Sequence, residues 1–199
     1  MAGDANDADR RREGILLVSN HAWGREGKYA AYYALLAIND PSPLVRAACV
    51  RALGKVNDPT YVPQLARAMD DASSVVRLDA AVVLADLTGP AAMEPLRKHA
   101  MKDESVDVRM ACLKALRHYR DPQVTDVLLQ CLGESDFGLR YEARQSLIAL
   151  TGMDKGYEPA DWKVATAQPA AVESPRPSRP WWDWAGVTQK SPPQAAKAK

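Results

Sequence analysis

The chain has 199 residues, of which 47% are apolar and 26% are charged, and its formal net charge is +1. This composition is that of an ordinary globular protein with one domain and appendages, and it excludes the strongly basic footprint of a dedicated nucleic-acid-binding protein. The three cysteines, Cys49, Cys112 and Cys131, form no CxxC pair, so we expect reduced, buried thiols.

The N-terminus predicts neither export nor a membrane span. Acidic residues stand where a signal peptide has basic ones, and the apolar run from Ile15 to Val18 is far too short to cross a bilayer. We expect residues 1–7 to be disordered. The predicted location is cytoplasmic if Met1 is the true start, and the cell envelope if an upstream signal segment precedes it.

The first predicted element is a helix over residues 7–20, which caps a stack with Ile15, Leu16 and Val18. Four similar segments follow and align without gaps. Their arginines are 31, 32 and 31 residues apart, at Arg46, Arg77, Arg109 and Arg140. Such a period predicts a repeat protein.

Each of the four segments predicts an amphipathic helix, which we call helix B. Counted from the residue before the arginine, positions 0, +4, +8 and +11 are apolar and fall in one arc of a helix, which predicts a single buried stripe. These positions are Val45, Cys49, Leu53 and Val56; Val76, Ala80, Leu84 and Leu87; Val108, Cys112, Leu116 and Tyr119; Leu139, Ala143, Leu147 and Leu150. Ser42, Ser73, Ser105 and Asp136 are the predicted N-caps.

A second apolar segment precedes each cap and predicts a helix A, at residues 29–38, 62–69, 93–101 and 124–132. The unit is therefore helix A, turn, helix B and loop. One extra residue separates Leu96 from Val108, and we place it in the turn of the third repeat. Residues 157–166, with Trp162, predict a short closing element, so the repeat domain spans residues 8–166.

These repeats resemble HEAT repeats, in particular the short bacterial type found in phycobilin lyase subunits. The signature D-x-S-x-x-V-R-x-x-A-x-x-A-L occurs first at Asp40, Ser42, Val45 and Arg46, and the resemblance covers about residues 26–152. It implies an all-α, right-handed α-solenoid of about four HEAT-like helix-turn-helix repeats. It also implies that Arg46, Arg77, Arg109 and Arg140 join adjacent repeats rather than bind a ligand.

No motif in the sequence supports catalysis. His21, His99 and His118 belong to no HEXXH motif and to no His-Glu pair of the kind that holds iron in the di-iron HEAT-repeat hydroxylases, and no glycine-rich phosphate loop or GxSxG is present. We therefore expect no enzyme activity, no cofactor and no metal site.

The side of the B helices opposite the stripe is the candidate binding surface. Positions +2, +6 and +9 lie there, and in a HEAT-like stack they line the concave side. Apolar anchors beside basic residues favour a groove for a peptide with aromatic and acidic groups, with Leu78, Met110, Tyr141, Arg51, Lys114 and Arg117 as contacts. The alternative is that some of these side chains pack sideways against the next helix.

Residues 167–199 have the composition of a disordered tail rich in Pro, Ala and Lys. It contains one compact aromatic motif, Trp181, Trp182, Asp183 and Trp184. The motif has three interpretations: it docks on the chain's own repeats, it binds another molecule as a linear motif, or it is an unstructured remnant.

The sequence as a whole predicts a non-catalytic, protein-binding scaffold or adaptor. Its partner is another protein or peptide, with self-docking of the tail as a further possibility. Two alternatives remain open. One is a phycobilin-lyase-type subunit for chromophore attachment, from the repeat resemblance. The other is a structural protein anchored in the cell envelope, because residues 150–162 are similar to the closing stretch of HEAT-repeat proteins from bacterial envelopes.

Overall fold

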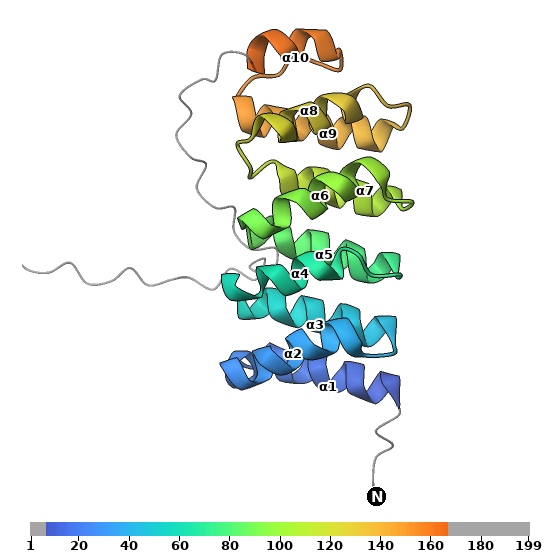
Figure 1. The fold of residues 1–199 in the computed structure, drawn as a ribbon, viewed down its shortest axis with the longest axis vertical. Coiled ribbons are helices and arrows are strands. Elements are labelled where there is room, and N and C mark those ends of the chain that lie inside the picture. Colours follow the sequence, from blue (N-terminus) through green and yellow to red (C-terminus); the bar gives the residue numbers. More distant parts are fainter. Residues whose placement is uncertain (1–6, 167–199) are drawn as a thin grey trace, which may run out of the picture.

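The computed structural model describes residues 7–166, and every regular element in that range is a helix. The helices stack in one row from α1 to α10 (Figure 1), which confirms the predicted all-α solenoid. In chain order they are α1 (Ala8–Asn20), η1 (Ala22–Arg25), α2 (Gly27–Asn39), α3 (Pro43–Val56), η2 (Pro59–Tyr61), α4 (Val62–Ala68), α5 (Ser74–Asp86), α6 (Pro90–Lys102), α7 (Val106–Leu116), α8 (Pro122–Leu132), α9 (Phe137–Thr151) and α10 (Pro159–Thr166).

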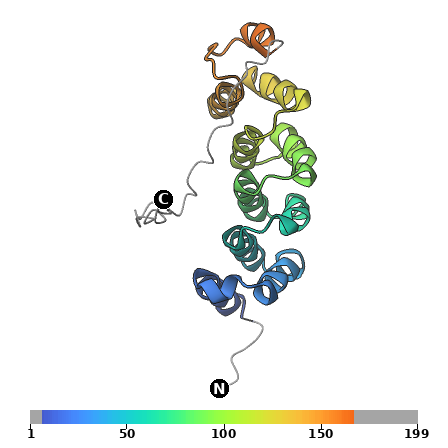
Figure 2. The same cartoon turned by 90° about the vertical axis from the view of Figure 1, so that its left-hand side faces the viewer.

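The helices form two layers. The A layer contains α2, α4, α6, α8 and α10, and the B layer contains α1, α3, α5, α7 and α9. Successive B helices contact one another more extensively than successive A helices do. Figure 2 shows both ends of the stack leaning toward the B layer, so the B helices lie on the inner side of the curve.

The predicted stripe is buried in all four B helices. Only the last stripe position is half-buried in three of the four segments, at Val56 of α3, at Tyr119 beyond the end of α7, and at Leu150 of α9. The stripe alone does not account for the buried surface, because α3, α5 and α7 also pack between two other B helices and α9 packs against α7. Position +5 is buried where another B helix follows, at Val50, Ala81 and Leu113, and position +7 is buried at Ala52, Val83, Ala115 and Ser146.

All four predicted caps stand directly before a B helix, but they act in two ways. The side chains of Ser105 and Asp136 accept hydrogen bonds from the N–H groups of Val108 and Leu139. Ser42 and Ser73 make no such bond, and their own N–H groups donate to the preceding aspartates instead. The side chain that organises each turn is therefore mainly that of the repeated Asp.

The sequence places the extra residue of the third repeat in the turn, and this prediction is wrong. Helix α6 continues to Lys102, so the turn to α7 has only three residues, Asp103 to Ser105. The corresponding turn between α4 and α5 has five residues, because α4 ends at Ala68. An i,i+4 contact of 2.8 Å between His99 Nδ1 and Asp103 Oδ2 spans the last turn of α6.

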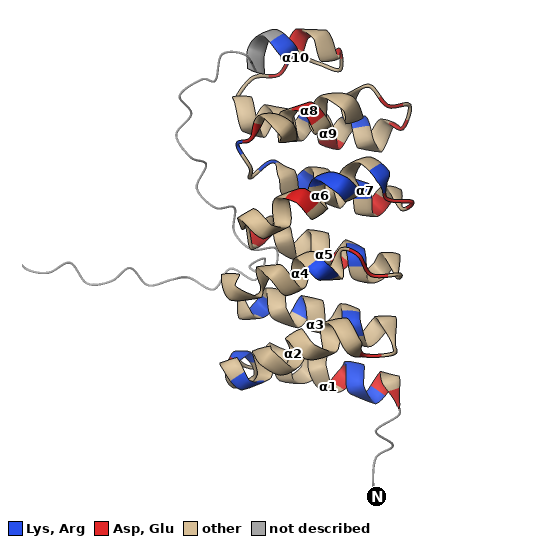
Figure 3. Cartoon of the chain, in the orientation of Figure 1, with Lys and Arg blue, Asp and Glu red and all other residues tan. Residues whose placement is uncertain are grey.

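A ladder of ion pairs joins each repeat to the next along the edge formed by the A–B turns. The guanidinium of Arg46 donates to both oxygens of Asp71, at 2.7 and 2.8 Å, and also to the carbonyl of Asp40. Arg77 repeats the arrangement with Asp103, at 2.8 Å for each bond. Figure 3 shows acidic and basic segments following one another along this edge.

The ladder extends further than predicted at one end and less far at the other. Arg109 donates to Glu134, and Arg11 of α1 donates to Asp40 at 2.9 and 3.0 Å, a rung that the sequence did not reveal. Arg140 makes no ion pair with a residue in the range 7–166. Its guanidinium lies 5.2 Å from the centre of the Tyr157 ring.

Asp103 is the most heavily hydrogen-bonded carboxylate of the ladder. Burial by itself raises the pKa of this carboxyl, but hydrogen bonds from Arg77, the Ser105 N–H and His99 outweigh it and lower the pKa to about 2. The same competition lowers the pKa of Asp40 and of Asp71. These three aspartates are therefore ionised at neutral pH.

Both ends of the stack are closed within the range 7–166. Ile15 of α1 is buried, and Leu16 and Val18 pack against the core. At the other end Trp162 of α10 is fully buried, and its indole N–H donates to the carbonyl of Gly156 at 3.0 Å. Gly156 has a φ of 74°, a left-handed conformation that glycine adopts without strain.

We predict that Arg77→Ala lowers the free energy of unfolding by about 3 kcal/mol, because it leaves the buried carboxylate of Asp103 without its bidentate partner. The control is Lys98→Ala, since Lys98 and Asp70 form an ion pair in which both side chains are more than half exposed. The control should cost less than about 1 kcal/mol. Urea unfolding followed by circular dichroism measures both, and equal losses would contradict a structural role for the ladder.

We also predict that the ladder loses stability in acid. A carboxyl with a lowered folded-state pKa stabilises the fold above its unfolded pKa, and this contribution disappears as the pH falls through the folded value. The advantage of the wild type over Asp103→Asn should therefore shrink by roughly 2 kcal/mol between pH about 4 and about 2. Asp126→Asn, at an exposed site on α8, is the control. Parallel stability curves for wild type and Asp103→Asn would refute the prediction.

Candidate functional site

The surface that the sequence singles out is the side of the B layer turned away from the A layer, which we call the B-helix face. Of its predicted apolar contacts, Tyr141 is 42% exposed, whereas Leu78 and Met110 are half-buried and pack against the core. Met110 lies under the start of α9, where a Cβ on Gly138 would come within 3.0 Å of its sulfur. The half-buried side chains thus pack sideways, as the alternative interpretation expects, and their role as ligand contacts stays a prediction.

The predicted basic contacts are mostly paired with the next B helix. Arg51 of α3 donates to Asp79 of α5, and Arg117, directly after α7, contacts Glu142 of α9 at 3.5 Å. Lys114 is exposed and forms no ion pair with residues in the range 7–166. The face is therefore apolar with balanced charges, and it is less basic than the sequence suggests.

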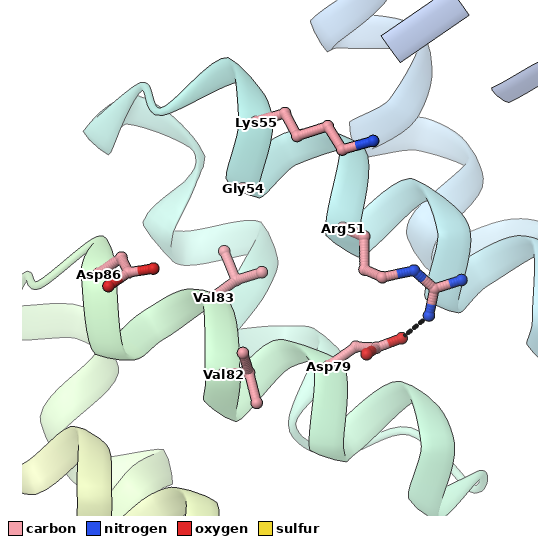
Figure 4. A pocket seen from close by; sticks show the side chains of 7 residues that line it. All are labelled: Arg51, Gly54, Lys55, Asp79, Val82, Val83 and Asp86. Atoms are coloured by element: carbon pink, nitrogen blue, oxygen red, sulfur yellow. Dashed lines mark hydrogen bonds and ion pairs between the residues drawn. The ribbon is translucent and has the colours of Figure 1, made fainter. Parts of the chain in front are cut away.

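A pocket of about 250 Å³ opens on this face between α3 and α5 (Figure 4). The two helices are close at its floor, since a Cβ on Gly54 would come within 2.8 Å of a Val83 methyl carbon. The pocket is lined by Arg51, Gly54, Lys55, Asp79, Val82, Val83 and Asp86. Three of these, Arg51, Gly54 and Val82, occupy positions that the sequence assigns to the face.

The charged groups of the pocket are partly withdrawn from water. Burial raises the pKa of Asp79 although Arg51 opposes this shift, and burial also raises the pKa of Asp86. Burial, reinforced by Arg51 and Arg25, lowers the pKa of Lys55. Lys55 Nζ donates to the Asn20 side-chain oxygen at 2.6 Å. An apolar group with a polar edge fits such a site, because the site offers both hydrogen-bond donors and acceptors beside valine methyl groups.

The sequence interpretation missed a second apolar row on the B helices. The first turn of each of the four predicted helices carries one exposed large apolar side chain, at Leu44, Val75, Val106 and Phe137. These four positions are each 31 residues apart. The 31-residue period is the sequence signal that marks them, although they stand two residues before the arginine in the first two repeats and three before it in the last two.

Exposed large apolar residues are unevenly distributed between the layers. Six of the ten in the range 7–166 lie on α3, α5, α7 and α9, at Leu44, Val75, Val82, Val106, Phe137 and Tyr141. Helices α4, α6 and α8 carry none, and the remaining four are Leu17, Trp23, Tyr32 and Leu35. The B layer is thus the apolar surface of the repeats.

The histidines and cysteines have structural surroundings. His99 lies between Asp103 at 2.8 Å and Asp70 at 3.4 Å, so it belongs to the edge of the ladder. All three cysteines are buried, and burial raises the pKa of Cys49 to about 12 and that of Cys112 further. Within residues 7–166 no three His, Cys, Asp or Glu side chains gather as a metal site would require.

The predicted linear motif, Trp181, Trp182, Asp183 and Trp184, lies outside the described residues, as does the whole segment 167–199. In the range 7–166 no helix combines the length and apolar character of a membrane span.

Comparison with known proteins identifies the repeats. A family model described as HEAT repeats matches residues 32–100 and 90–148, which together cover more than half of the 199 residues. Among curated proteins, no sequence matches this chain.

A solved structure has a similar arrangement of helices. The X-ray structure of YibA from Escherichia coli superposes with a TM-score of 0.60 at 21% sequence identity, over 75% of this chain. The chain spans 55% of the length of YibA. At this identity the likeness concerns the fold alone.

The burial of the thiols gives a simple test. We predict that Ellman's reagent, which reacts with thiolates, modifies no cysteine rapidly in the native protein, because burial keeps all three thiols protonated and covered. In denaturant three thiols per chain should react. A fast-reacting native thiol that Cys49→Ala removes would contradict this account and would indicate an accessible nucleophile.

Proposed function

This chain belongs to the HEAT-repeat family, and we propose that it is a non-catalytic module that binds a protein segment across its B-helix face. The observation that carries the proposal is the concentration of exposed large apolar side chains on α3, α5, α7 and α9. Solvent-exposed apolar residues that gather on one surface are typical of interaction sites, whereas single ones are not.

The spacing of the apolar row suggests the form of the ligand. Packed helices lie about 8–10 Å apart, so neighbouring members of the row Leu44, Val75, Val106 and Phe137 are separated by about that distance. An extended polyproline II segment advances about 9.3 Å in three residues. A peptide that crosses the B helices in this form can therefore place one apolar side chain on each repeat when its anchors are three residues apart.

The pocket between α3 and α5 supplies an anchor point. Val82 and Val83 provide an apolar wall, and Arg51, Asp79 and Asp86 provide polar groups at its rim. An aromatic side chain with one polar edge, such as tryptophan or tyrosine, matches these groups. Such residues are common binding anchors because they bury a large apolar area and still satisfy a hydrogen bond.

A displayed library of random peptides, selected on the full-length chain, tests the proposal. We predict enrichment of peptides with aromatic or aliphatic residues at every third position. Val75→Asp with Val106→Asp should weaken the selected peptides by about tenfold or more, because each change places a charge in the apolar row. Both side chains are exposed, so the fold should tolerate the changes.

The matched control is Tyr32→Asp with Leu35→Asp, which alters two equally exposed apolar residues on α2 of the A layer. Fluorescence anisotropy of labelled peptides gives the dissociation constants. Peptides that are indifferent to the B-layer changes, or that respond only to the A-layer changes, would refute the proposed site.

A further inference from the structure

The ladder of ion pairs ends on an arginine, Arg140, for which residues 7–166 supply no acid. Each earlier rung joins a B-layer arginine to the acid of the following A–B turn, as Arg77 joins Asp103 and Arg109 joins Glu134. Arg140 occupies the same position in α9 as Arg109 does in α7. In the range 7–166 no carboxylate pairs with Arg140, because the closing helix α10 follows without a further A–B turn.

The surroundings of Arg140 are those of an incomplete site. Its Nε is buried and has no hydrogen-bond partner among residues 7–166, which is costly for a charged donor. Its guanidinium lies over Tyr157, whose ring centre is 6.0 Å from that of Phe137. The Phe137 ring is in turn 6.4 Å from that of Tyr141.

These aromatic side chains are open to a ligand. Phe137 is 66% exposed, more than any other large apolar residue described, and Tyr141 is 42% exposed. An unpaired guanidinium beside an exposed aromatic cluster matches a carboxylate that has aromatic neighbours. The second arginine of this region, Arg144, also contacts Tyr157, but it is already paired with Asp154.

We propose that the chain supplies this ligand itself. The segment Trp181–Trp184 docks on the last repeat, with Asp183 on Arg140 in the place that Glu134 takes on Arg109, and with the tryptophans against Phe137 and Tyr141. Asp183 is the acid of the segment 167–199 that has aromatic neighbours on both sides, whereas Glu173 has none. The tail thereby completes the ladder.

The length of chain permits this docking. Trp181 follows Thr166 by 15 residues, which span at most about 50 Å. Helix α10 packs on α8, and α8 packs on α9, so the span needed is about two helix spacings, or roughly 20 Å. Charge is complementary as well, since Asp183 is negative and Arg140 has no partner in the range 7–166.

The docked segment would also regulate the B-helix face, and this consequence rests on the proposed function. Phe137 and Tyr141 belong to that face, so the docked segment covers the part of the face that the last repeat contributes. A ligand that crosses all four repeats must displace it, whereas a ligand of α3 and α5 alone need not.

Tryptophan fluorescence of the full chain tests the docking. In a Trp23→Phe background the remaining tryptophans are the buried Trp162 and the three of the motif, so quenching by acrylamide reports mainly on the motif. We expect the motif to be shielded, and Arg140→Glu and Asp183→Arg each to raise its accessibility. An ion pair of this kind shifts the ratio of docked to free segment by roughly two- to fivefold.

The decisive comparison is the double variant Arg140→Glu with Asp183→Arg, which restores the pair with reversed charges and should restore the shielding. Arg67→Glu makes the same charge change at an exposed site of α4 and should have no effect. Asp183→Arg alters no residue in the range 7–166, so it remains informative if Arg140→Glu weakens the fold.

Three results would overturn the proposal. The motif could be as accessible in the parent as in denaturant, or the double variant could fail to recover the shielding. Alternatively, shielding could increase with protein concentration, which would place the motif on a second copy of the chain. None of these results affects the response of selected peptides to Val75→Asp with Val106→Asp, so the two proposals fail separately.

Discussion

The stack depends on a bidentate ion pair between the arginine near the start of one B helix and the acid of the next turn. The Asp103 side chain is 1% exposed, so its charge is tolerable only because Arg77, His99 and a backbone N–H all donate to it. Such pairs contribute little net stability compared with an apolar contact, but they strongly penalise any other alignment. In a solenoid of similar helices, where apolar stripes could slide past one another, this penalty sets the register.

The fixed register also explains why similar residues are accessible on successive B helices. Helices α3, α5 and α7 are buried toward their A partners and toward both neighbouring B helices, and α9 toward α8 and α7, which leaves only a narrow strip open to a ligand. Because the register is fixed, equivalent residues of the strip align from repeat to repeat and form rows. The first turns of the B helices align as well, so a segment that crosses the helices meets the exposed side chains from Leu44 to Phe137 one after another, although Leu44 and Val75 stand two residues before their arginines and Val106 and Phe137 three.

The last repeat differs where the stack stops. Position +5, which is apolar at Val50, Ala81 and Leu113, is Arg144 in α9, where no further B helix follows and Asp154 pairs with the charge. Arg140 keeps the ladder arginine without the next acid. A terminal repeat must satisfy groups that internal repeats satisfy through their neighbours, and this requirement makes it the natural place for a segment from outside the stack.

Much of the fold follows from the sequence alone. The 31-residue period, the apolar stripe and the residues before each B helix indicate the number and order of the repeats and the start of each B helix, because helix periodicity and capping are local properties. The stripe residues Val45, Cys49 and Leu53 are fully buried, as their spacing predicts. The role of the repeated arginines was also predictable, although only through the resemblance to a family.

The tertiary structure alone decided which residues of the B helices remain accessible. Val82 and Leu78 both lie on the side opposite the stripe, yet Val82 is exposed and Leu78 is half-buried against the core. The pairing of Arg51 with Asp79, the rung from Arg11 and the isolation of Arg140 likewise depend on contacts between repeats. Such contacts depend on how far each helix is displaced and rotated against its neighbour, and a local sequence pattern does not encode those distances.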